Sequence, residues 1–151
     1  MTKYKKVLLA VDFSSDNDQI IERAQKIVKD DGAELLLVHA HEPTIAAYQT
    51  GGMASFSTQV VALDDELRKM GEKNLAELAK KLKVKSSNCF LPYGKASLEI
   101  KRVAEENDVD LIVLGTHGQH GLGLLLGSTA NAVLHGVSCD VLAVRAKEKK
   151  D

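Results

Sequence analysis

The stretch from Gly115 to Thr129 contains the residue types most suited to chemistry. It holds five of the eleven glycines, follows the apolar run 109–114 and precedes a helical pattern that begins near Ser128. A strand, a glycine-rich turn and a helix N-terminus in this order form a phosphate cradle, because glycines let an anion approach the backbone and the first helical N–H groups point at it. The alternative is a plain connector that only caps the helix. No Gly-Lys-Ser/Thr triplet is present, which excludes a Walker A loop.

Five short apolar runs and four helical patterns must position this stretch. Strands are expected at 5–11, 34–40, 87–92, 110–114 and 139–145, and helices from about 15 to Gly32, at 60–82, at 96–107 and at 128–135. Strict alternation predicts an α/β fold: one open, doubly wound, five-stranded parallel sheet with helices on both faces. The helical spacing predicts buried side chains at Leu63, Leu67, Met70, Leu78 and Leu82, and at Leu98 and Leu134.

Two features of this pattern fall on one crevice. In a doubly wound sheet, ligands bind beyond the carboxyl ends of the strands, at the point where the winding reverses. With the strand order 3-2-1-4-5, that point lies between the first and fourth strands. Asp12 follows the first strand and Gly115 follows the fourth. The sequence therefore places both beside the predicted phosphate cradle.

Composition bounds the class of protein. The chain has 151 residues, a formal net charge of -1 and 44% hydrophobic residues, which predicts one globular domain over 1–151 with a charged tail at 146–151. The balanced charge argues against a nucleic-acid or membrane surface. Cys89 and Cys139 are expected on opposite edges of the sheet, as buried thiols, and two cysteines make no disulfide framework. These features favour a cytoplasmic location. The long segment 41–58 is either a functional lid or a spacer.

Catalytic and metal readings of the polar residues are weaker. No zinc-type spacing joins the histidines to a cysteine, so no metal site is expected among His39, His41, His117, His120 and His135. Asp12 has no second carboxylate, lysine or arginine predictably beside it, and Ser128 has no paired base. Asp12 is therefore interpreted as a binding or structural residue, and Ser128 as a phosphate ligand or helix cap, with no catalytic residue assigned.

Several segments together resemble the small, single-domain universal stress proteins, over essentially the full length of the chain. The matching segments are 5–14, 36–40, 110–118, 125–130 and 139–145. The resemblance implies the strand order 3-2-1-4-5, a role in stress survival and a homodimer formed through the last strand, 139–145. One branch of the family binds ATP, through Gly, two residues, Gly, nine residues and then Gly-Ser or Gly-Thr. Here Gly115, Gly118, Gly127 and Ser128 fit that motif, but eight residues (119–126) stand where nine are usual.

The resemblance also implies a role for each candidate binding residue. Asp12 would lie beside the adenosine, and Ala40 would offer its backbone N–H and C=O to the adenine edge. Gly115 and Gly118 would let the chain pass close to the ribose and phosphates. The phosphates would accept hydrogen bonds from the backbone N–H groups of Gly127, Ser128 and Thr129. A cation, Mg²⁺ or Mn²⁺, would be held mainly through the phosphates.

The leading hypothesis from the sequence is an ATP-binding, homodimeric sensor or adaptor of the stress response, without fast catalysis. The alternative is a dimeric interaction module that binds no nucleotide, in which the glycine-rich stretch has only a structural role. A slow nucleotide hydrolase is the least favoured reading, because the usual catalytic groups are missing.

Overall fold

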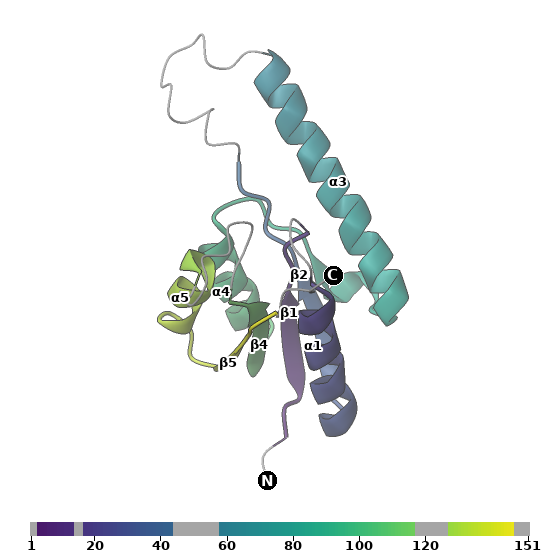
Figure 1. Ribbon diagram of the computed structural model, residues 1–151, viewed down its shortest axis with the longest axis vertical. Coiled ribbons are helices and arrows are strands. Elements are labelled where there is room, and N and C mark those ends of the chain that lie inside the picture. Colours follow the sequence, from purple (N-terminus) through teal and green to yellow (C-terminus); the bar gives the residue numbers. More distant parts are fainter. Residues whose placement is uncertain (1–2, 14–16, 44–57, 117–126, 147–151) are drawn as a thin grey trace, which may run out of the picture.

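Five parallel strands form one sheet in the order β3-β2-β1-β4-β5 (Figure 1). The structure is a computed structural model that describes residues 3–13, 17–43, 58–116 and 127–146. Every strand pair in it is parallel. The strands are β1 (Lys6–Ala10), β2 (Glu34–Val38), β3 (Cys89–Phe90), β4 (Leu111–Gly115) and β5 (Asp140–Val144). The strand order and the parallel pairing confirm the fold predicted from the sequence.

Helices cover both faces of this sheet. They are α1 (Asp18–Asp31), α3 (Thr58–Leu82), α4 (Ala96–Glu106) and α5 (Ser128–Leu134), with a short 3₁₀ turn, η2 (Ser86–Asn88), before β3. Successive strand side chains point to opposite faces, so β1 sends Val7 and Leu9 into a core with α1 and α3, and sends Leu8 into a core with α4 and α5. The two apolar cores are the physical basis of the doubly wound arrangement.

The first half of α3 overturns one prediction. Leu78 is buried, but Leu63, Leu67 and Met70 are 50%, 44% and 58% exposed. A helix of 25 residues is about 37 Å long, whereas strands of five residues span about 17 Å, so α3 must extend past the sheet. Figure 1 shows α3 projecting well beyond the strands. The amphipathic spacing is real, but the sheet covers only the second half of the helix.

Smaller differences concern single positions. Leu98 and Leu134, predicted to point inward, are 58% and 45% exposed, because their neighbours Ser97 and Val133 occupy the buried side of each helix. The cysteines do lie at opposite edges of the sheet and are free thiols, but both are half-buried rather than buried. The segment 41–58 and the tail 146–151 fall mostly outside the described residues.

Candidate functional site

A cavity of about 630 Å³ lies beyond the carboxyl ends of β1, β2 and β4, where the winding of the sheet reverses. Its volume is in the range of small-molecule sites. The predicted site residues that line it are Asp12, Ala40, Gly115, Gly127, Ser128 and Thr129. Gly118, the remaining predicted residue, lies outside the described part of the chain. The fold therefore brings six positions from four separate segments to one crevice.

The backbone direction at Ala40 follows from the hydrogen bonds around it. The N–H groups of His39 and His41 bond to Phe90 and Pro92 on the β3 side, at 3.0 and 2.8 Å. The carbonyl of Val38, two residues before Ala40, instead accepts the N–H of Val11 on the β1 side at 3.0 Å. Because successive peptide groups of a strand alternate in direction, the N–H and C=O of Ala40 face the β1 side, toward the crevice.

Two backbone hydrogen bonds fix the ends of the glycine-rich stretch. The N–H of Thr116 bonds to the carbonyl of Val144 at 3.0 Å, and the N–H of Gly127 bonds to the carbonyl of Thr116 at 2.6 Å. Gly127 is the N-cap of α5, so Ser128 is the first helical residue and not the cap, which corrects that reading. The N–H groups of the first helical turn, which begins at Ser128, have no acceptor within the helix.

The conformation of Gly127 allows a side chain. Its φ of -61° and ψ of 154° lie in the extended region that all residues adopt. The backbone geometry therefore does not require glycine here. Gly127 directly precedes the first N–H groups of α5, which is the end of a helix where an anion binds.

Acidic groups in the crevice are few. Asp12 lies on its wall, and the carbonyl of Asp12 accepts a hydrogen bond from the Asn17 amide at the start of α1. Glu42, a second acid lining the cavity, accepts the N–H of Ala96 at 2.8 Å. No group of three His, Cys, Asp or Glu side chains that could hold a metal ion occurs among the residues described.

His39 joins β2 to the end of β1 and to α3. Its Nδ1 lies 2.9 Å from the carbonyl oxygen of Val11, and because a carbonyl only accepts, Nδ1 carries the proton. Its ring meets Phe13 edge-on, with ring centroids 4.9 Å apart. Gly71 of α3 lies against the other side of the ring, where an added Cβ would be 3.2 Å from Cδ2. The missing side chain at Gly71 lets α3 approach the crevice closely.

A second polar contact holds the projecting part of α3. The buried imidazole of His41 donates from Nε2 to Asp64 Oδ1 at 3.0 Å, and the Tyr93 hydroxyl donates to Asp64 Oδ2 at 3.0 Å. The backbones of His41 and Tyr93 also form a parallel β-bridge, and their rings lie with centroids 5.3 Å apart and planes tilted by 40°. Asp64 therefore ties the helix to the carboxyl end of the sheet. We call His41, Asp64 and Tyr93 the α3 clamp.

Sequence reasoning missed the contribution of α3 to the crevice. Leu67, Met70, Gly71 and Asn74 all line it, opposite the glycine-rich side. Their helical spacing was visible in the sequence, but it indicated a buried stripe and not the wall of a cavity.

A second hollow, of about 530 Å³, lies near the start of β2, between the ends of α1 and α3. It is remote from the carboxyl ends of the strands, where ligands bind in this fold.

Comparison with known proteins identifies the family. The sequence model described as "Universal stress protein family" matches residues 3–145. Universal stress protein A homolog 2 of Coxiella burnetii is 39% identical over 148 residues, which cover 97% of this chain and 99% of the relative. The family and this relative match almost the whole of the described structure.

Solved structures share the fold. Universal stress protein UspA from Lactobacillus plantarum has a TM-score of 0.79 at 22% identity, covering 96% of this chain and all of that one. A universal stress protein in complex with cAMP has a TM-score of 0.60 at 23% identity, covering 95% and 98%. No helix in the described ranges combines the length and apolar character needed to cross a membrane. The chain belongs to the universal stress protein family.

Proposed function

We propose that this chain binds an adenine nucleotide, ATP foremost, and acts as a homodimeric, cytoplasmic sensor or adaptor of the stress response without fast catalysis. The observation that carries the proposal is the convergence of Asp12, Ala40, Gly115 and the Gly127–Thr129 segment on one cavity. A structurally similar universal stress protein was solved with cAMP, which shows that a protein of this fold can hold an adenine nucleotide.

The crevice offers a separate group for each part of a nucleotide. The inward-facing N–H and C=O of Ala40 suit the hydrogen-bonding edge of adenine, and Asp12, which lines the same cavity, would lie beside the adenosine. The first N–H groups of α5 suit phosphate oxygens, because they have no partner within the helix. Gly115 and Gly118 would give the ribose and phosphates room beside the backbone. Mg²⁺ or Mn²⁺ would be bound through the phosphates.

The homodimer would form through residues 139–145. β5 is the last strand on its side of the sheet, and pairs there only with β4 among the described strands. Its central residues Val141, Leu142 and Ala143 are apolar and half-buried. Proteins generally cover such an edge, because an exposed apolar strand pairs with other chains. Sedimentation of the purified protein tests this prediction: a dimeric mass supports it, and a monomeric mass at micromolar concentration contradicts it.

The nucleotide is tested first on the purified wild-type protein. The protein is denatured, released small molecules are separated by chromatography, and ATP is titrated calorimetrically into nucleotide-free protein. Released nucleotide or a saturable heat supports the proposal. Absence of both favours the alternative, a dimeric interaction module that binds no nucleotide. The specific feature that favours this alternative is the spacing of eight residues, and not nine, between Gly118 and Gly127.

Gly127→Val tests the position of the phosphates. The extended φ and ψ of Gly127 accept valine, so the fold should be retained, but the melting temperature should fall by a few degrees because valine is a poorer N-cap than glycine. The new side chain would fill the space in front of the α5 N–H groups, and ATP binding should fall at least about tenfold, since each charge-assisted hydrogen bond lost costs about 1.5–3 kcal/mol. Unchanged ATP binding would show that the phosphates lie elsewhere.

A separate measurement tests the hydrolase. Phosphate release from ATP by the wild-type protein that is lost in Asp12→Asn would indicate slow hydrolysis.

A further inference from the structure

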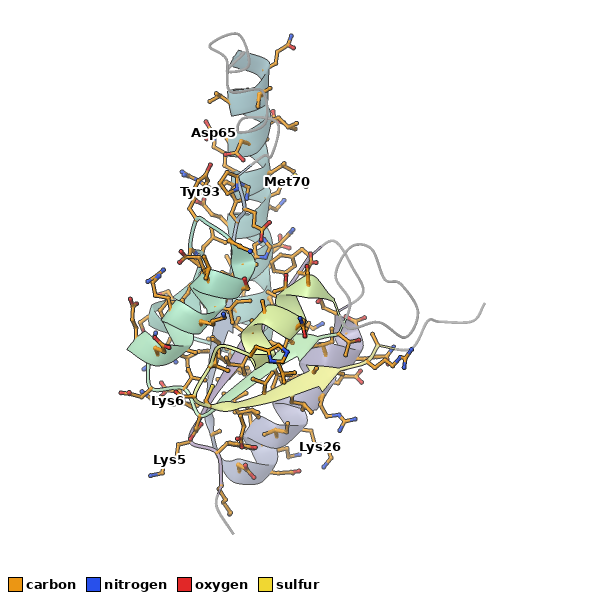
Figure 2. All side chains as sticks on the ribbon, turned by 90° about the vertical axis from the view of Figure 1, so that its left-hand side faces the viewer. Lys5, Lys6, Lys26, Asp65, Met70 and Tyr93 are labelled. Carbon is orange, nitrogen blue, oxygen red and sulfur yellow. The ribbon has the colours of Figure 1, made fainter. Side chains whose placement is uncertain are left out.

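The first half of α3 presents apolar side chains that the described residues cover only in part. Leu67 is 44% exposed and Met70 is 58% exposed. Figure 2 shows Met70 and Asp65 on the part of α3 that stands clear of the sheet and the other helices. Exposed apolar surface on a fixed helix is unfavourable in water, so the exposure of these two side chains requires a physical explanation.

Leu67 and Met70 differ from the other exposed apolar residues of α3 in what they face. Both line the crevice beside Gly71 and Asn74, whereas the similarly exposed Val61 and Leu63 do not line it. α3 packs near β3, while α5 packs against β5, on the opposite side of the sheet. The crevice therefore has an apolar wall from α3 and a polar wall from the start of α5.

The apolar wall is held in place by contacts on both sides of Leu67 and Met70 along the helix. One turn before Leu67, Asp64 is bound by His41 and Tyr93 in the α3 clamp. Directly after Met70, Gly71 lies against the His39 ring, which is itself bonded to Val11. The wall is thus preorganised before any ligand arrives, which lowers the entropy cost of binding.

We infer that Leu67 and Met70 form the surface on which the flat base of the nucleotide packs. The wall lines the same cavity as Ala40, whose backbone N–H and C=O would take the polar edge of the same base. A thioether and a branched alkyl group suit an aromatic face, and methionine adapts its shape to what it contacts. This inference rests on the proposed nucleotide function and assigns recognition of the base to α3, separately from recognition of the phosphates by α5.

The division of labour is tested with three probes on the full chain: ATP, adenosine and inorganic tripolyphosphate, each titrated calorimetrically. Met70→Ser should weaken ATP and adenosine by a similar factor, roughly tenfold for the lost apolar contact, and leave tripolyphosphate unchanged. Val61→Ser is the matched control, since Val61 is a similarly exposed apolar residue on the same helix that does not line the crevice. It should alter none of the three affinities.

A second readout does not depend on affinity. The chain has three methionines, so ¹³C-methyl labelling gives few signals, and the Met70 signal is assigned by its loss in Met70→Leu. Adenosine should shift the Met70 methyl resonance through the ring current of the base, and tripolyphosphate should not. If wild type binds ATP but Met70→Ser behaves like Val61→Ser and the Met70 methyl does not move, the inference is wrong and the proposed function stands. If wild type binds none of the probes, both are wrong.

Discussion

Asp64→Ala tests whether the α3 clamp holds the projecting half of the helix. The substitution removes the acceptor of two hydrogen bonds, each 3.0 Å long. The His41 side chain is only 9% exposed, so its Nε2–H would lose its partner in a place that water reaches poorly. Leaving such a donor unsatisfied costs about 1–3 kcal/mol, and the better helix propensity of alanine returns at most about 0.7 kcal/mol. The expected net loss is about 1–2 kcal/mol.

This loss should be local. Residues 59–70 are mostly exposed, whereas Leu75, Leu78 and Ala79 remain in the core formed with α1 and β1. Hydrogen exchange measured by mass spectrometry should therefore be about 5- to 30-fold faster in peptides covering 59–70, with 75–82 unchanged. Asp65→Ala, at the exposed neighbouring position, is the control and should leave both segments as in wild type. Equal acceleration along all of α3, or none anywhere, would refute the role assigned to the clamp.

Two further predictions concern the backbone and the thiols. Lys83 has a left-handed φ of 59°, so Lys83→Gly should raise the melting temperature by about 1–3 °C. Lys85 has an extended φ of -71°, so the control Lys85→Gly should lower the melting temperature. Differential scanning calorimetry of the two variants and wild type measures both shifts. Burial raises the pKa of the Cys89 and Cys139 thiols, so less thiolate is present at pH 7. Iodoacetamide should therefore alkylate both cysteines more slowly than it alkylates the thiol of free glutathione, and the difference should disappear in denaturant. Alkylation of the folded protein at the rate of glutathione would contradict the second prediction.

The sequence alone determined the fold through local patterns. Short apolar runs such as 34–38 and 111–114 can be buried only between two layers of helices, and the glycine at position 32 ends α1 with a left-handed φ of 66°. Strict alternation of strands and helices then leaves few topologies. The positions of Asp12 and Gly115 at the ends of strands followed directly, because the carboxyl ends of parallel strands lie at one edge.

Only the tertiary structure decided what α3 does. The spacing of Leu63, Leu67 and Met70 states which face of the helix is apolar, but not what covers that face. What covers this face depends on how far the helix extends beyond the shorter strands. It also depends on two contacts between residues remote in sequence, Gly71 with His39 and Asp64 with His41. These contacts join residues 23 or more positions apart, so no local pattern encodes them. These contacts hold the apolar side of α3 beside the crevice, where it forms one wall instead of part of the core.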